Sequence, residues 1–139
     1  MQTFLPYSDV IKSVQCLDDK RLGKQRVEAM QILKALSNPT YGWQNHPAVK
    51  MWRGYEALLT KYMNEAINEW IRRGFKNTMQ KSQKYIFFDY SPYLKMPIPQ
   101  WWGGRIHETH KSNLLRKNPN FYGKFGWNVP DNLPYYWPV

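Results

Sequence analysis

The sequence contains a single cysteine, Cys16, so no disulfide can form within the chain. A single thiol is typical of a protein in a reducing cytosol. Because Cys16 lies among apolar residues at helical spacing, we interpret its side chain as a packing residue rather than a catalytic one. The first residues, MQTFLPYSDV, lack the basic start and apolar stretch of a signal peptide. No apolar run approaches the ~20 residues needed to cross a bilayer. We therefore expect a cytoplasmic protein without a membrane segment.

Carboxylates are also scarce. Ten Asp and Glu stand against 20 Lys and Arg, which gives a formal net charge of +10, and aromatic residues make up 17%. Cations bind phosphates and rings stack on bases, so this composition favours a nucleic-acid partner. The alternative is a basic, solubilising surface over an aromatic core. With 139 residues, 42% hydrophobic and 22% charged, the chain (1–139) suits a single compact domain.

Several motifs for metal or cofactor chemistry are missing. The sequence has neither GxxxxGK[ST] nor GxGxxG, and no serine hydrolase motif. Its three histidines are His46, His107 and His110, of which the last two would share a helix face. A zinc site needs three or four ligands. We therefore expect no metal and no cofactor.

The apolar periodicity predicts a mainly α fold of about four helices, with long aromatic and proline-rich loops and a similar C-terminal tail. Ser8 or Asp9 could cap a first short helix, and Asp18 or Asp19 a second helix that ends at 37–39. Gly23 costs the second helix about 1 kcal/mol relative to Ala. The expected apolar faces consist of Val10, Ile11, Val14 and Leu17 in the first helix, and of Leu22, Ala29, Met30, Leu33 and Leu36 in the second.

Two further helices are expected. The longest should run from Pro47 to the glycine at Gly74. The last should run from Arg105 to Lys117 and end at 118–119. Between them, the segment IFFDY favours a short strand or a buried irregular run, and SPYLKMPIPQWWGG favours a loop.

Two basic clusters stand out. The first consists of Lys12, Lys20, Arg21, Lys24 and Arg26; the second consists of Arg105, Lys111, Arg116, Lys117 and Lys124, interleaved with Phe121, Tyr122, Phe125 and Trp127. Cations position a phosphate backbone, and aromatics stack on bases or wedge between them. The alternatives are solvated helix faces and an aromatic core plug. Glu28 follows the first cluster, and local sequence alone favours a surface carboxylate with i, i+4 partners.

Several blocks resemble the phage pyrimidine-dimer DNA glycosylase/AP lyase family of the endonuclease V type. In chain order they are MQTFLPY (Met1–Tyr7), LDDKRLGKQRVEA (Leu17–Ala29), NHPAVKMWRGYEALL (Asn45–Leu59), RRGF (Arg72–Phe75), WWGGRIHETHKSNLLRKNP (Trp101–Pro119) and FYGKFGW (Phe121–Trp127). The resemblance covers most of the chain. Where phage members carry an arginine immediately before the catalytic glutamate, this chain has Val27.

The resemblance implies that the α-amine of residue 1 attacks C1′ of the damaged nucleotide, assisted by Glu28. Gln2 is too large to favour methionine removal, so Met1 is the expected nucleophile and Gln2 the fallback. An unperturbed α-amine has a pKa of about 7.7–8.0, so a useful fraction is neutral at physiological pH. An amine can form an imine with the opened sugar, and a carboxylate can then act on the C2′ proton. Such chemistry needs no metal.

The expected function is therefore excision of cyclobutane pyrimidine dimers from double-stranded damaged DNA, followed by β-elimination, by a monomer in a bacterial or phage-infected cell. The expected DNA-binding residues are Gln2, Lys20, Arg21, Lys24, Arg26, His46, Arg105, His107, His110, Lys111, Arg116, Lys117, Phe121, Tyr122, Lys124 and Trp127.

Other functions stay open from the sequence. These are a glycosylase/lyase for another damaged or modified base, an AP-site lyase alone, a noncatalytic double-stranded DNA-binding module, and an RNA-binding protein. A distance beyond about 10 Å between the Met1 nitrogen and Glu28 would favour the noncatalytic module, because proton transfer needs hydrogen-bond reach or one water.

Overall fold

Helices make up all the regular structure in the part of the chain that the computed structural model describes, residues 1–84 and 96–139. The mainly α prediction is confirmed. The helices are α1 (Val10–Gln15), α2 (Asp19–Ser37), α3 (Pro47–Trp52), α4 (Glu56–Arg72), α5 (Ile106–Lys117) and α6 (Pro119–Tyr122), followed by the 3-10 turn η2 (Gly123–Phe125). The segment IFFDY, residues 86–90, lies outside the described residues.

The first two helices begin where their acidic caps predict. The Asp9 carboxylate accepts a hydrogen bond from the Lys12 backbone N–H at 2.9 Å and so caps α1. Asp18 precedes α2 without capping it through its side chain, because that carboxylate has other partners. The prediction for Ile11 was wrong: its side chain is 39% exposed, because the buried face of so short a helix is narrow.

The buried face of α2 is shifted from the predicted one. Leu22 and Ala29 are buried as expected, whereas the expected Met30, Leu33 and Leu36 are only half-buried. The fully buried stripe consists of Leu22, Gln25, Ala29, Ile32 and Ala35. A glutamine therefore occupies a core position of this helix.

The single long helix predicted from residue 47 was also wrong, because the chain breaks between α3 and α4. Gly54 has a φ of +92°, which a residue with a side chain rarely adopts, and this ends the first helical segment. As a result α4 has 17 residues and is shorter than α2, which has 19. The predicted stop at Gly74 is confirmed, with a φ of +89° just after α4.

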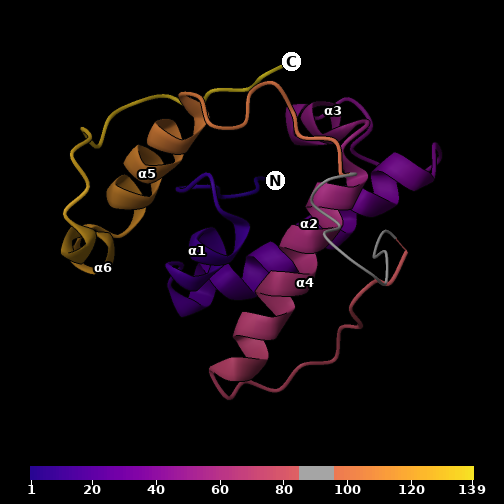
Figure 1. Cartoon of the computed structure of the whole chain (residues 1–139), viewed down its shortest axis with the longest axis horizontal. Helices are drawn as coiled ribbons and strands as arrows, with labels where there is room; N and C mark the ends of the chain where they lie inside the picture. Colours follow the sequence, from indigo (N-terminus) through magenta and orange to yellow (C-terminus); the bar gives the residue numbers. More distant parts are fainter. Residues whose placement is uncertain (85–95) are drawn as a thin grey trace.

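The core forms where α2 and α4 pack against each other, with α1 against α4 (Figure 1). Packing explains the glycine at position 23, because a Cβ there would lie 3.0 Å from the Trp70 ring on α4. A glycine at this point lets the two helices approach. Cys16 is 7% exposed beside this core, and burial raises the pKa of its thiol to about 12. This thiol is therefore protonated at neutral pH.

The N-terminal segment lies in the middle of the molecule, between α5 on one side and α2, α3 and α4 on the other (Figure 1). Residues 2–6 are all buried. The C-terminal tail runs past α5 and returns towards α3, so both ends of the chain meet the same region. No helix of the described residues is long and apolar enough to span a membrane.

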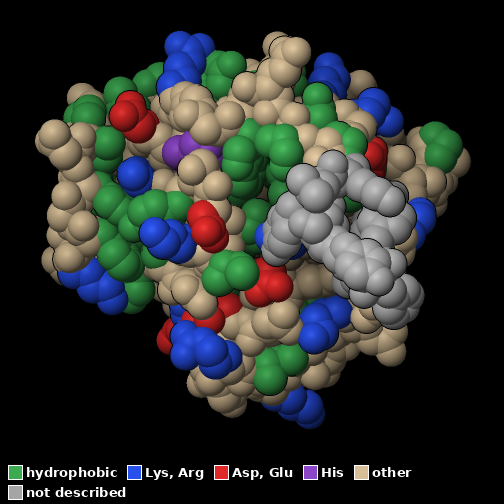
Figure 2. Space-filling model, in the orientation of Figure 1, with side chains coloured by type: hydrophobic (Ala, Val, Ile, Leu, Met, Phe, Trp, Pro, Cys, Tyr) green, Lys and Arg blue, Asp and Glu red, His purple; other side chains and the backbone are tan. Residues whose placement is uncertain are grey.

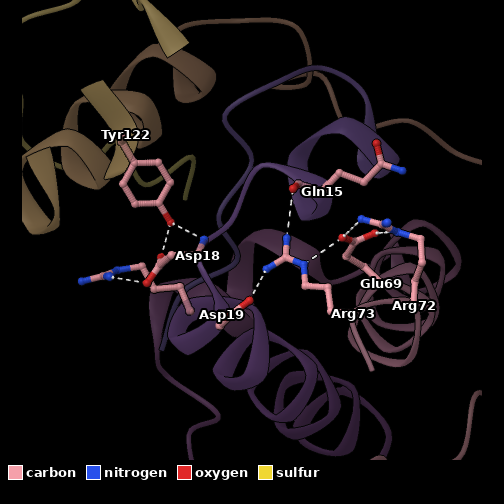
Figure 3. Close-up of polar contacts among 8 residues, drawn as sticks. Gln15, Asp18, Asp19, Glu69, Arg72, Arg73 and Tyr122 are labelled. Atoms are coloured by element: carbon pink, nitrogen blue, oxygen red, sulfur yellow. Dashed lines mark hydrogen bonds and ion pairs between the residues drawn. The ribbon is translucent and has the colours of Figure 1, made fainter. Parts of the chain in front are cut away.

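The start of α2 is tied to α6 through Tyr122 (Figure 3). The Tyr122 hydroxyl accepts a hydrogen bond from the Asp18 backbone N–H at 3.0 Å and donates one to the Asp18 carboxylate. The Arg21 guanidinium pairs with the other oxygen of that carboxylate at 3.1 Å. The predicted DNA-binding residues Arg21 and Tyr122 therefore both hold Asp18.

A second tie joins the start of α2 to the end of α4 (Figure 3). The Arg73 guanidinium donates to the Asp19 carboxylate at 2.9 Å, to the Gln15 carbonyl at 3.0 Å and to Glu69 at 2.8 Å. These contacts fix the orientation of α2 against α1 and α4. The catalytic candidate Glu28 lies on α2, so they also help to fix its position.

Candidate active site

The N-terminal segment is held by hydrogen bonds to its main chain from both sides. On the α5 side, the His110 Nδ1 accepts from the Leu5 backbone N–H at 2.9 Å. The His107 Nε2 accepts from the Gly103 backbone N–H at 2.9 Å, so its Nδ1 carries the proton and donates to the Leu5 carbonyl at 2.7 Å. The two imidazoles thus satisfy both polar groups of Leu5.

On the other side the same segment meets α3 and α4. The Trp52 indole N–H donates to the Thr3 hydroxyl at 3.0 Å, and the Tyr62 hydroxyl lies 2.8 Å from the Phe4 carbonyl. Because every neighbour is itself buried, the segment has a single well-defined path. The α-amine at its start is therefore held in place.

This path brings the α-amine of Met1 to 3.9 Å from the Glu28 Oε1 on α2. This distance is far below the roughly 10 Å beyond which the noncatalytic alternative would be favoured, and one water molecule can bridge it. The Met1 side chain is 3% exposed, whereas the Glu28 side chain is 27% exposed and therefore accessible to solvent. A primary amine next to an accessible carboxylate can act as a nucleophile assisted by a base.

Burial raises the pKa of Glu28, because the charged carboxylate is partly removed from water. The charges of the Met1 amine, Lys24 and Lys117 and a hydrogen bond from Gln25 oppose this rise. The net direction is upward, which makes this carboxylate a stronger base than an ordinary surface glutamate.

Gln25 joins the carboxylate to the N-terminal segment. Its Nε2 donates to the Glu28 Oε2 at 2.7 Å and to the Gln2 carbonyl at 3.0 Å. Its Oε1 accepts from the Phe4 backbone N–H at 2.8 Å and lies 2.7 Å from the Tyr62 hydroxyl. The amide is 1% exposed, and its nitrogen and its oxygen are both hydrogen-bonded, so it fixes the amine and carboxylate relative to each other.

Aromatic residues of the C-terminal tail contact the N-terminal segment and the residue before α3. The Tyr135 ring lies 6.4 Å from that of Phe4, and Trp137 lies 5.8 Å from His46. The charge of Glu28 contributes to the raised pKa of Tyr135, after burial. Burial and, next, the charge of the amine lower the pKa of His46. The charge of Glu28 thus acts on Tyr135, and that of the Met1 amine acts on His46.

Most of the predicted basic DNA-binding residues lie at the surface. Lys20, Lys24, Arg105, Arg116, Lys117 and Lys124 are exposed, and Arg21, Arg26, His46 and Lys111 are half-buried. Figure 2 shows Lys and Arg side chains distributed over one face, with apolar side chains exposed between them. Of these cations, Lys24 and Lys117 act on the Glu28 carboxylate, which places them beside the reaction centre.

Other predicted cations rest on aromatic rings or on the tail. Arg26 stacks at 4.2 Å over Trp70 and Arg105 at 4.1 Å over Tyr136. Arg116 donates to the Asp131 carbonyl at 3.0 Å and thereby holds the tail on α5. Lys111 lies 5.0 Å from the Tyr7 ring. These cations are held in fixed positions rather than extending freely into solvent.

Four predicted DNA-binding residues are buried: Gln2, His107, His110 and Tyr122. Burial lowers the pKa of His110 to about 3, so its ring is neutral and serves only as a hydrogen-bonding group. These side chains do not reach the surface in this conformation. They support the site instead, and contact with DNA stays a prediction for them.

The predicted aromatic residues near the end of the chain form one cluster, in which Tyr122 and Phe125 stack on Trp127 and Phe121 meets its neighbours edge to face. Trp127 lies 5.1 Å from Phe125 and 5.8 Å from Tyr122, with nearly parallel rings, and its N–H donates to the Tyr7 hydroxyl at 2.9 Å. Lys124 lies 3.9 Å over the Phe121 ring. Phe121 and Trp127 are half-buried, so their edges stay accessible.

Sequence reasoning missed Gln25 and the tail residues Tyr135 and Trp137. The sequence contains one indication of the role of Gln25, which lies three residues after Leu22 and four before Ala29 on an apolar helix face. For Tyr135 and Trp137 the only indication is the aromatic composition of the C-terminal tail. Among the described residues, no group of three or more His, Cys, Asp or Glu side chains could hold a metal ion.

Comparison with known proteins adds one finding. A family model described as pyrimidine dimer DNA glycosylase matches residues 1–83. This range contains the N-terminal segment and the helices from α1 to α4, including Gln25 and Glu28. No match was found among curated proteins or solved structures.

Proposed function

Since this chain belongs to the pyrimidine dimer DNA glycosylase family, we propose that Met1 and Glu28 carry out base removal and strand cleavage on UV-damaged DNA. Family membership makes it a DNA glycosylase with DNA as its substrate. The additional AP lyase step rests on one observation, the 3.9 Å separation between the Met1 amine and the Glu28 carboxylate.

In the proposed first step, the neutral Met1 amine attacks C1′ of the damaged nucleotide. The N-glycosidic bond breaks, and the base leaves with the bonding electron pair and takes up a proton. The sugar ring then opens, with its O4′ protonated, as the amine nitrogen forms a C1′=N imine. The carboxylate of Glu28 faces this centre and stabilises the positive charge that develops on the sugar.

In the second step, the imine acidifies the C2′ proton and Glu28 accepts it. The electron pair forms a C2′=C3′ bond, and the 3′ phosphate leaves with the C3′–O electrons. Water hydrolyses the imine, which frees the amine and releases an unsaturated aldehyde on the nicked strand. The pKa of Glu28, raised by burial, favours proton uptake by this carboxylate.

Borohydride trapping tests this proposal. The full chain is incubated with duplex DNA that carries either an AP site or a thymine dimer, reduced, digested and mapped by mass spectrometry. We expect the reduced sugar to be attached to the N-terminal peptide. The mass of that peptide also shows whether the mature chain begins at Met1 or at Gln2. Protein with a selectively blocked α-amine should give no adduct.

Two lysines provide the internal control. Lys24 and Lys117 lie near Glu28, so an adduct on either of their peptides would assign the imine to a side-chain amine and contradict the proposal. Absence of any adduct on both DNAs would remove the lyase mechanism. An adduct with AP-site DNA but none with dimer DNA would leave an AP lyase without dimer excision.

A further inference from the structure

One tryptophan differs from the rest in its exposure. The Trp43 side chain is 55% exposed, whereas every other tryptophan of the chain is buried or half-buried. A large aromatic ring left in water contributes little to folding. Packing therefore does not account for a tryptophan at this position.

The backbone of Trp43 is strained as well. Its φ is +72°, the only positive value at a non-glycine residue in the ranges 1–84 and 96–139. Bulky side chains disfavour this region, and such strain persists only when the surrounding structure imposes it. The residues around it are anchored: the Gln44 Nε2 lies 2.7–3.0 Å from the carbonyls of Ala35, Asn38 and Tyr41, and the Trp43 carbonyl accepts from the His46 backbone N–H at 3.0 Å.

The exposed ring begins an aromatic row that leads to the reaction centre. Trp43 lies 5.8 Å from the His46 ring, edge to face, and His46 lies 5.8 Å from Trp137. Trp137 in turn lies 5.7 Å from Tyr135. Tyr135 lies 6.4 Å from the Phe4 ring, so the row leads to the N-terminal segment that carries the Met1 amine.

From this placement we propose that Trp43 binds an unstacked nucleobase of damaged DNA by stacking. The inference rests on the proposed function, because it takes damaged DNA as the ligand. To reach a sugar carbon, the protein must open the duplex locally, which leaves at least one base without its stacking partner. A rigidly presented indole offers that base a replacement surface, and the chain's charge of +10 draws the DNA backbone to it.

The proposal is tested by comparing the DNA affinities of the wild-type full chain and of its variants on three duplexes. The DNA probes are three duplexes: one with a tetrahydrofuran AP-site analogue opposite adenine, one with this analogue in both strands at that position, and one undamaged. Affinity is measured for wild-type protein and for Trp43→Ala, Trp43→Phe and Trp43→Asn. Ile71→Ala is the control, because Ile71 is 49% exposed at the end of α4 remote from α3 (Figure 1).

We expect Trp43→Ala to weaken binding to the analogue opposite adenine by roughly 5- to 150-fold, the range that one base–aromatic stack supplies, and Trp43→Phe to weaken it less. A loss that disappears when the opposite base is absent identifies that base as the ligand. An equal loss on both damaged duplexes, with none on undamaged DNA, identifies a base that flanks the lesion. No loss, or an equal loss on all three duplexes, would overturn the proposal.

Trp43→Asn separates a binding role from a structural one. Asparagine tolerates positive φ, so this variant should melt at the wild-type temperature or above it while binding damaged DNA as weakly as Trp43→Ala. A lower melting temperature would assign the ring to folding and contradict the proposal. Trapping of wild-type protein tests the lyase mechanism separately, because the tetrahydrofuran analogue forms no imine.

Discussion

Replacing Gln25 with leucine should disturb the pairing of the Met1 amine with Glu28 while leaving both catalytic groups in the chain. Leucine has a similar size but cannot form hydrogen bonds. The Phe4 backbone N–H and the Gln2 carbonyl would lose their partners inside the protein, and Glu28 would lose a donor at 2.7 Å. The variant therefore tests whether one buried amide holds the amine and the carboxylate together.

The expected loss of stability follows from those contacts. Each buried polar group left unsatisfied costs about 1–3 kcal/mol, so the two main-chain groups together cost about 2–6 kcal/mol. For a domain of this size that corresponds to a fall of roughly 7–20 °C in melting temperature. Gln15→Leu on α1 is the matched control, because its side chain is exposed and its contact with Arg73 is made by the main-chain carbonyl, which leucine keeps.

Catalysis should change in a way that lost stability alone does not explain. Without the Gln25 donor the Glu28 carboxylate is less well stabilised, so its pKa rises further and the acid limb of the lyase rate moves to higher pH. Other groups that act on this carboxylate are the Met1 amine, Lys24 on α2 and Lys117 on α5, and Tyr62 and Tyr135 lie within its field. None of these groups is itself substituted in the variant, although the Tyr62 hydroxyl loses its contact with the Gln25 amide.

The assay is a single-turnover rate on AP-site duplex with saturating protein, measured across pH below the melting transition. We expect a fall on the order of 100-fold at the pH optimum, because small misplacements of reacting groups cost about that much. An unchanged melting temperature together with an unmoved acid limb would refute the role assigned to Gln25.

Further predictions concern single side chains. Glu28→Gln should lower the lyase rate by about 100- to 10,000-fold with duplex affinity retained, whereas Glu65→Gln on α4 should not; equal losses would show a general charge effect. Because burial raises the pKa of Glu28, the wild-type lyase rate should fall on acidification at a higher pH than an ordinary glutamate would give. A fall whose midpoint lies at or below the usual pKa of glutamate would contradict this. Tyr122→Phe should destabilise the fold by about 1–3 kcal/mol in thermal unfolding, since Asp18 loses both a donor and an acceptor, with Tyr136→Phe as the control. Lys24→Ala and Lys117→Ala should each reduce the slope of log affinity against log salt by about 1, and an unchanged slope would place these cations outside the DNA interface.

Helix boundaries were predictable where a single residue sets them. Asp9, Pro47 and Gly74 act through their own side chain or backbone, and the structure places them as expected. The break at Gly54 was missed because apolar residues recur at helical spacing on both sides of it, and the periodicity gives no sign of the turn.

The site was less predictable because its contacts join distant segments through main-chain atoms. His107 and His110 at helical spacing are equally compatible with a DNA-facing pair and with two ligands of the Leu5 backbone. Periodicity cannot identify a partner that is a carbonyl or an N–H about a hundred residues earlier. Likewise, the pairing of Met1 with Glu28 came from the family resemblance, and the distance between them came only from the structure.

The position of the N-terminal segment also determines when the reaction centre is completed during synthesis. The segment is made first, yet its partner His110 follows Leu5 by 105 residues. Contacts of such long sequence separation form late, because a long loop must close before they contribute. During synthesis α2 and α4 emerge before α5, so Gln25, Trp52 and Tyr62 are available to the N-terminal segment before His107 and His110 are. The hold of α5 on Leu5 is therefore added after the contacts that place the amine on the α2 side.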